Sequence, residues 1–196
     1  MEVLKINQKN FKKVITEATE YIKNGKVIIC PTDTVYGLIC DAKNKKAVEK
    51  IFKIKKRSFQ KPISIFVKNL KAAKKYSKIN KNQEKFLKKA WPGKTIVVLR
   101  VKGSFPSGIV CQWGKVGLRM SKYKLLNEIL NKFKGPIAQT SANITGKPTP
   151  STIQDILKQF KNKKWQPDIV INVGELSGKP SKVIDLTVSP YKILRN

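Results

Sequence analysis

Four short segments carry hydroxyl, amide or basic side chains at the ends of apolar runs, and these residues could do chemistry. They are PTDTVYGL at 31–38, the cluster Lys55-Lys56-Arg57 followed by Lys61, TSAN at 140–143, and Ser181 together with Arg195. Each has an ordinary explanation alone, as a capped turn, a basic helix end, a polar loop or a chain terminus. Because sites on sheet proteins form where strands end, the four together predict an anion-binding cleft.

Arginine is scarce in a chain that is rich in lysine. Of the 42 basic residues, only Arg57, Arg100, Arg119 and Arg195 are arginines. Lysine can replace a solvated surface arginine, but it cannot supply the planar fork that binds phosphate or carboxylate through two hydrogen bonds. We therefore treat the four as site candidates, and the alternative is that each makes a structural ion pair.

The sequence excludes several common chemistries. Histidine is absent, which removes Ser-His and Cys-His nucleophiles and the usual transition-metal ligand. The segment 91–95 ends like a phosphate-binding P-loop, but Lys88 occupies the position of the required first glycine. We interpret 91–95 mainly as a structural turn that enters a strand.

Composition limits the compartment and the partners. The net charge of +30 favours anionic partners such as nucleotides or RNA, although a solvated surface explains most of it equally well. Cys30, Cys40 and Cys111 have no C-x-x-C spacing, so we expect buried thiols rather than disulfides or a zinc site. No apolar run approaches the roughly 20 residues of a membrane span, and the N-terminal residues lack the basic-then-apolar pattern of a secretory signal. These features predict a cytoplasmic protein that does not enter a membrane.

Apolar periodicity predicts one α/β domain over residues 1–196. Helical patterns occupy 11–24, 47–52, 81–90, 122–133 and 152–161, and strand-like runs occupy 27–30, 63–67, 95–100, 116–120, 136–140, 169–173 and 183–186. Their alternation favours a large, partly parallel sheet flanked by helices. We find no repeat or linker that would mark a second domain.

The order and composition of the motifs resemble the YrdC/Sua5 threonylcarbamoyl-AMP synthases. The matching stretches are PTDTVYGL at 31–38, Lys55-x-Arg57, AWPGK at 90–94, VGLRM at 116–120, TSANITG at 140–146, SKVIDL at 181–186 and KILRN at 192–196. The chain length is similar to that of the short bacterial form. The resemblance implies a YrdC-like, DHBP synthase-like fold: an α/β domain with a large, twisted, mixed open sheet and a concave, positively charged face.

The resemblance also implies an activity and its residues. The reaction joins L-threonine, bicarbonate or CO2 and ATP into threonylcarbamoyl-AMP, and it releases pyrophosphate. The residues implied for ATP binding are Lys55, Arg57, Lys61, Arg119, Ser141, Asn143 and Arg195, of which Lys55, Arg57, Ser141 and Asn143 are the catalytic set. Thr34, Ser121 and Ser181 are implied for threonine.

No protein ligand for a metal is implied, since Mg2+ is expected to arrive on the triphosphate. Asp33 is the carboxylate nearest to such a site, and a loop-capping role is the favoured interpretation for it. The product would serve N6-threonylcarbamoyladenosine formation in tRNAs that read codons starting with A. Transient contact with the tRNA threonylcarbamoyl-transferase complex, and contact with tRNA or other RNA, are the partners expected beyond the substrates.

Two alternatives stay open at this point. The first is a non-catalytic RNA-binding protein for tRNA or rRNA maturation, which the charge fits equally well. Its aromatic residues, at 8%, follow core spacing instead of forming a stacking platform. The second is a carbamoyl-transfer domain like that of hydrogenase maturation proteins, which sits within much longer chains.

Overall fold

A single mixed sheet organises the structure, a computed structural model that describes residues 1–111 and 113–196. Within these residues the sheet has 11 strands in the order β1-β9-β2-β3-β8-β4-β7-β6-β10-β11, and β5 pairs with β6. The strands are β1 Glu2–Lys5, β2 Ile28–Cys30, β3 Gly37–Asp41, β4 Ser64–Phe66, β5 Ser77–Lys78, β6 Thr95–Val101, β7 Lys115–Arg119, β8 Ile137–Ser141, β9 Ile169–Asn172, β10 Lys182–Asp185 and β11 Lys192–Arg195. Parallel and antiparallel pairs both occur, which confirms the predicted class.

The helices are short, and most begin at a side-chain cap. They are α1 Phe11–Lys23, α2 Lys45–Lys55, α3 Leu70–Tyr76, α4 Lys81–Ala90, α5 Lys124–Phe133 and α6 Ile153–Phe160. Asn44, Asn69, Asn80 and Thr152 each accept a hydrogen bond from a first-turn amide of the helix that follows, which satisfies a donor that the helix itself leaves free. Gly25, with φ of 68°, follows the Asn24 cap at the end of α1, where the left-handed backbone favours glycine.

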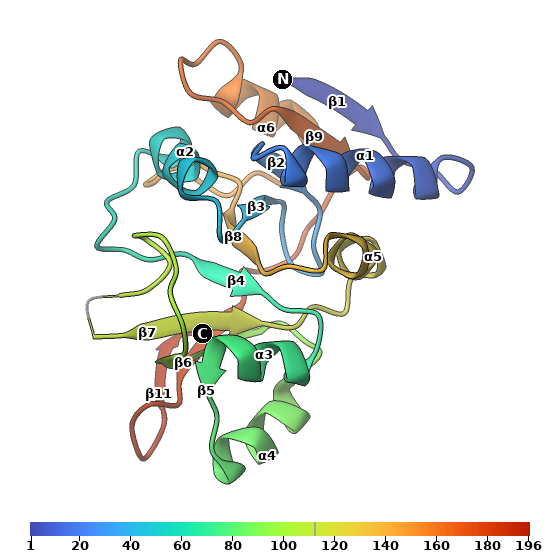
Figure 1. Ribbon diagram of the computed structural model, residues 1–196. Coiled ribbons are helices and arrows are strands. Elements are labelled where there is room, and N and C mark those ends of the chain that lie inside the picture. Colours follow the sequence, from blue (N-terminus) through green and yellow to red (C-terminus); the bar gives the residue numbers. More distant parts are fainter. Residues whose placement is uncertain (112) are drawn as a thin grey trace.

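Two apolar layers cover the sheet (Figure 1). One layer joins α1 and α5 to residues such as Ile28, Ile39 and Phe66. The other joins α2, α6, α3 and α4 to the opposite side of the same strands, through residues such as Leu38 and Leu118. Among the described residues no helix is long and apolar enough to cross a membrane.

The helices α1 and α5 leave part of their own sheet face uncovered. Strand alternation turns Val97 and Leu99 of β6 into the core beside α3 and α4, while Ile96 and Val98 point to the other face. Gly117 of β7 pairs with Val98 and also faces outward. The uncovered area is therefore the floor of a cleft.

Candidate functional site: an anion-binding cleft

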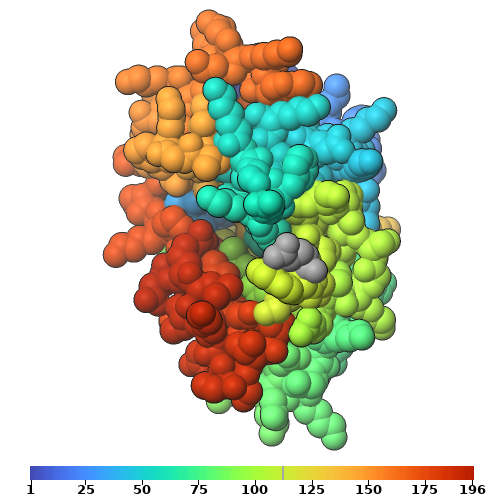
Figure 2. All heavy atoms as spheres, turned by 90° about the vertical axis from the view of Figure 1, so that its left-hand side faces the viewer, coloured from blue at the N-terminus to red at the C-terminus, as the bar shows by residue number. Residues whose placement is uncertain are grey.

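A cleft of about 490 Å³ opens over this floor. Its walls are the 31–37 segment, the loop after α2, residues 180–181 and the end of β11. Figure 2 shows a hollow between the cyan residues that follow α2 and the red C-terminal residues. Segments that lie far apart in the sequence thus converge on one cavity.

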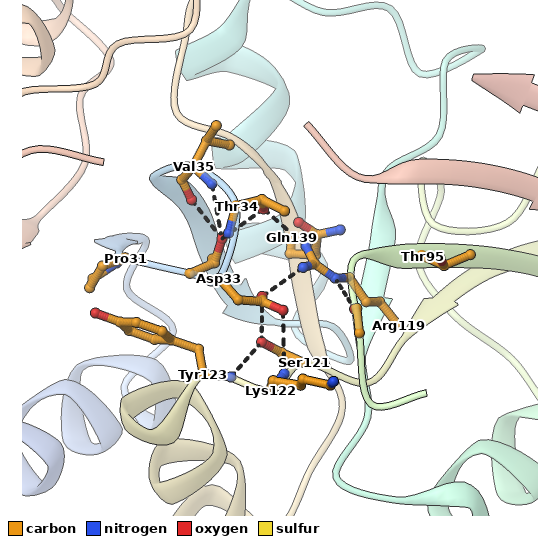
Figure 3. Close-up of polar contacts among 12 residues, drawn as sticks. Pro31, Asp33, Thr34, Val35, Thr95, Arg119, Ser121, Lys122, Tyr123 and Gln139 are labelled. Atoms are coloured by element: carbon orange, nitrogen blue, oxygen red, sulfur yellow. Dashed lines mark hydrogen bonds and ion pairs between the residues drawn. The ribbon is translucent and has the colours of Figure 1, made fainter. Parts of the chain in front are cut away.

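Arg119, at the end of β7, is the most constrained charge in the cleft. Its side chain is 1% exposed. Nε donates to the carbonyl of Gly93 at 3.0 Å, Nη1 to Oγ1 of Thr34 at 3.2 Å, and Nη2 to Oδ1 of Asp33 at 2.6 Å (Figure 3). Ser121 Oγ donates to the same Asp33 oxygen at 2.6 Å. Asp33 therefore joins the 31–37 segment to Arg119 and Ser121 at the end of β7. The sequence had predicted that Asp33 caps its own loop, and that prediction was wrong.

Arg119 lines the cleft, and the carboxylate of Asp33 compensates its charge. Burial lowers the pKa of Arg119, the charge of Asp33 raises it, and the charge of Arg195 lowers it. A guanidinium has five N–H donors, and the three contacts above use one on each nitrogen. The remaining N–H on each of Nη1 and Nη2 can meet a ligand carboxylate or phosphate.

Arg57 and Arg195 face the same cavity from opposite walls. Arg57 Nε donates to the Lys61 carbonyl at 2.6 Å and Nη2 to the Pro62 carbonyl at 3.2 Å. Arg195 Nε donates to the Ser181 carbonyl at 2.8 Å. Burial lowers the pKa of both, and the charge of Arg195 lowers that of Arg57 further.

Neither of these two arginines forms an ion pair with a residue in the described part of the chain. Two like charges in one cleft destabilise each other, and a bound anion would relieve that repulsion. The pair therefore makes this end of the cavity chemically suited to an anion.

Lys55 lies behind the wall that carries Ser141. It is 2% exposed, and Nζ donates to the carbonyls of Ser141 and Asn143 at 2.7 and 2.6 Å and to Asn143 Oδ1 at 3.0 Å. Burial, with a smaller contribution from Arg57, lowers the pKa of Lys55 to about 7. Ser141 Oγ donates to Asn143 Oδ1 at 2.7 Å. This network holds the 141–143 turn against the cleft.

The structure places the sequence-predicted residues in three groups. Lining the cleft are Thr34, Arg57, Arg119, Ser141, Ser181 and Arg195. Directly behind its wall lie Lys55, Asn143 and Ser121, each bonded to a residue of the lining or its support. Lys61 is exposed, and its carbonyl orients Arg57. The segment 91–95 forms the predicted turn, in which Trp91 Nε1 donates to the Thr95 carbonyl at 2.9 Å.

Several lining residues escaped the sequence prediction. They include Gln139, whose amide donates to Ser64 Oγ, and the ion pair of Lys115 with Asp185 at 2.8 Å. Cys111, expected to be buried, is only half-buried and also lines the cleft. The alternation of side chains along a strand could have identified these residues in the sequence. Residues 115 and 117 lie on the same face of their strand as Arg119, and residue 139 lies on the same face as Ser141.

No group of three or more candidate metal ligands occurs among the described residues. The two carboxylates nearest the cleft are already engaged: Asp33 by Arg119, and Asp185 by Lys115. Both carboxylates are thus held by basic side chains of the protein itself.

Fold and cleft together define an α/β protein with an arginine-lined cleft over one face of its mixed sheet. The chain belongs to the Sua5/YciO/YrdC family, because the family model Sua5_yciO_yrdC, described as telomere recombination, matches residues 20–196.

Similar proteins fit this assignment. The chain is 34% identical over 187 residues to a putative threonylcarbamoyl-AMP synthase of Methanocaldococcus jannaschii, covering 95% of this chain and 86% of that one. It is 31% identical over 176 residues to a threonylcarbamoyl-AMP synthase of Enterobacter, covering 87% and 90%. The crystal structure of Pyrococcus abyssi Sua5 complexed with L-threonine superposes with a TM-score of 0.88 at 31% identity. That match covers 99% of this chain and 56% of the Pyrococcus chain.

Proposed function

We propose that this chain is a threonylcarbamoyl-AMP synthase that uses L-threonine, bicarbonate or CO2, and ATP. The observation that carries the proposal is the convergence of Arg57, Arg119 and Arg195 on one cleft, two of them without an ion-pair partner among the described residues. Relatives that cover most of the chain are named as this enzyme, and the Pyrococcus relative is described with L-threonine. The names of these relatives and the arginine-lined cleft thus both support an enzyme that uses ATP.

The cleft divides into two ends under this proposal. Arg57, Arg195 and Ser141 hold the triphosphate, and Lys55 and Asn143 fix the turn that presents Ser141. The threonine end is the side of Thr34, where Ser181 lines the wall and the Ser121 hydroxyl donates to Asp33. Lys61 belongs to the nucleotide end, where its carbonyl accepts a hydrogen bond from Arg57. Arg119 lies between the two ends, because it donates a hydrogen bond to Thr34 and because the charge of Arg195 lowers its pKa.

The reaction needs no nucleophile from the protein. The threonine amine forms an N–C bond to CO2 and loses a proton, which gives a carbamate. A carbamate oxygen then forms a bond to the α-phosphorus of ATP while the bond to the bridging oxygen breaks and pyrophosphate leaves. The arginines neutralise the developing charge, and the cleft holds an unstable carbamate beside its target. This chemistry suits a chain without histidine.

Further parts of the proposal follow from the same cleft. Mg2+ comes with the triphosphate, because the nearby carboxylates of Asp33 and Asp185 are ion-paired. Residues 1–196 act as one domain, which the single continuous sheet supports. The free cysteines suit a reducing cytoplasm. The product passes to a tRNA threonylcarbamoyl-transferase complex for N6-threonylcarbamoyladenosine formation, and the basic surface allows contact with RNA.

Mass spectrometry of the products tests the activity. The protein is incubated with ATP, bicarbonate and L-threonine, and three control reactions each omit one substrate. We expect threonylcarbamoyl-AMP and pyrophosphate only in the complete mixture. A protein that binds RNA but forms no threonine-dependent product would contradict the proposal in favour of the non-catalytic alternative, which the names of the relatives do not favour.

A further inference from the structure

The connection from β9 to β10 crosses the molecule beside the cleft. We call residues 173–181 the strap. β9 and β10 stand at distant places in the strand order, separated by β2, β3, β8, β4, β7 and β6. The strap must therefore span the region between them, and Pro180 and Ser181 at its end line the cleft. In Figure 2 this crossover is the orange-red segment between the orange and red parts of the surface.

The strap is tethered at its first half. Tyr36 Oη donates to the Gly174 carbonyl at 2.6 Å and accepts from the Val173 amide at 3.2 Å. The Leu176 amide donates to the Ser151 carbonyl at 2.9 Å. Because Tyr36 belongs to the same segment as Thr34, the strap and the threonine end of the cleft are fastened to each other.

Between that tether and the one at Ser181, whose carbonyl accepts from Arg195, Gly178 presses on Thr34. A β-carbon added at Gly178 would stand 1.8 Å from the Thr34 carbonyl oxygen, 2.7 Å from its carbonyl carbon and 3.0 Å from its α-carbon. Real side chains do not approach a backbone so closely, so even alanine would force the two segments apart. With both ends held, the strap cannot retract freely.

The backbone conformation does not require glycine at this position. The glycines with positive φ are Gly25, Gly103, Gly108, Gly114, Gly146 and Gly174. Gly178 is outside that set, and its φ lies in a region open to other residues. Close approach to Thr34 is therefore the reason for glycine here.

We propose that Gly178 is a positioning residue for the amino-acid end of the cleft. Because Gly178 has no side chain, the strap can pack directly against the Thr34 backbone. This packing keeps the Thr34 hydroxyl in contact with Arg119 and keeps the Thr34 amide hydrogen-bonded to Thr32 Oγ1 at 3.1 Å. Gly178 itself acts only through Thr34. The proposal rests on the assignment of L-threonine to this end of the cleft.

The test compares Gly178→Ala with Lys179→Ala, an exposed change in the same strap. Gly178→Ala should raise the KM for L-threonine about tenfold to a hundredfold, as expected for a displacement of about 1 Å, and leave the KM for ATP within about twofold. Hydrogen exchange should quicken at the amides of Thr34 and Val35, both of which donate to Thr32 Oγ1. Lys179→Ala should match the unmodified protein in every measurement.

Two results would overturn the role of Gly178. One is a Gly178→Ala protein with unchanged threonine KM and unchanged exchange at Thr34 and Val35. The other is an equal loss of ATP and threonine affinity together with a lower Tm, which would mean general disruption. If the unmodified protein makes no threonylcarbamoyl-AMP, the proposed function fails separately. The strap is then judged by amide exchange and by calorimetric binding of L-threonine, neither of which needs turnover.

Discussion

At the scale of single residues, lysine supplies most of the surface charge, whereas arginine is concentrated in the cleft. Its 38 lysines, the 42 basic residues less four arginines, are mostly spread over the surface. Three of the four arginines line one cleft, and Arg100, which donates to the Trp113 carbonyl at 2.9 Å, does not. A lysine ammonium supplies charge, but only a guanidinium can hold a backbone carbonyl and a phosphate at the same time with a fixed geometry. Arg57 does the first through Lys61 and Pro62, which leaves donors for the second.

Arg57→Lys should therefore weaken ATP binding about tenfold to a hundredfold while the protein stays folded. Loss of one hydrogen bond to a charged group costs about 1.5–3 kcal/mol, whereas the formal charge is unchanged. Arg100→Lys is the matched control, since the same exchange outside the cleft should leave ATP affinity as it was. Calorimetric titration with ATP measures both, and equal affinities for the two variants would contradict a directed role for Arg57.

Asp33 can be tested through stability, because its partner Arg119 is almost fully buried. Asp33→Asn removes the negative charge and leaves the Arg119 cation uncompensated, for which we expect a loss of about 3 kcal/mol in the free energy of unfolding. Glu20→Gln is the comparison: it breaks the exposed Lys23–Glu20 pair at 2.9 Å and should cost less than about 1 kcal/mol. Urea unfolding measures both variants. A similar small loss in each would show that Arg119 is held by its other contacts.

At the scale of elements, burial determined what the sequence could predict. Buried strands such as β2 and β9 have continuous apolar residues, and they were predicted within a residue or two. By contrast β1 and β11 are short and largely exposed, and β5 has only two residues, so no apolar pattern marks these strands. The strand β3 and the short helix α3 were also missed, because the first follows a polar loop directly and the second has only seven residues. These elements are fixed by pairing with distant partners, which local patterns do not record.

The same limit applies to the site. The motifs identified the residues that carry charge or hydroxyls, because those types are rare or clustered. They could not show that Asp33 meets Arg119, 86 positions along the chain, or that Gly178 meets Thr34. Such contacts depend on the order of strands in the sheet and on the crossover between β9 and β10.

The edge strand β11 gives a prediction at this scale. All four of its residues are exposed, and it pairs with β10 alone, so it adds little to the core while it carries Arg195 to the cleft. Removal of residues 191–196 should leave the circular dichroism spectrum nearly unchanged and weaken ATP binding about tenfold or more. Arg195→Gln separates the strand from its side chain. If truncation weakens binding far more than the point variant, β11 itself contributes to the site.

At the scale of the whole molecule, the net charge of +30 attracts any polyanion. The proposed function requires the cleft to select ATP among them. Between residues 50 and 127 the only acidic residue is Glu84, which pairs with Lys74 and Lys88. That long basic stretch includes the surface of α3 and α4 as well as the walls of the cleft. Charge alone therefore does not locate the site, and an experiment must distinguish diffuse attraction from directed contacts.

Ionic strength and two uncharged substitutions make that distinction. Ser141→Ala and Asn143→Ala change no charge, but they remove the hydroxyl that lines the cleft and the amide that receives Lys55 Nζ and Ser141 Oγ. ATP affinity should fall about tenfold in each, since a buried polar group loses its partner at about 1–3 kcal/mol. RNA association should stay as it was, because it depends on the number of phosphates that lysines neutralise. Ser104→Ala, an exposed hydroxyl outside the cleft, is the control.

Titration with ATP and with a short single-stranded RNA, each from about 50 to 200 mM salt, completes the test. RNA binding should weaken by orders of magnitude over that range, because each neutralised phosphate releases counterions. ATP binding should weaken far less, since directed hydrogen bonds in a partly enclosed cleft are screened less than surface charges. The opposite pattern, with ATP binding intact in Ser141→Ala and Asn143→Ala and RNA binding abolished, would mean that the cleft serves RNA. In that case the arginines would be part of a continuous basic surface, and the synthase assignment would lose the observation that carries it.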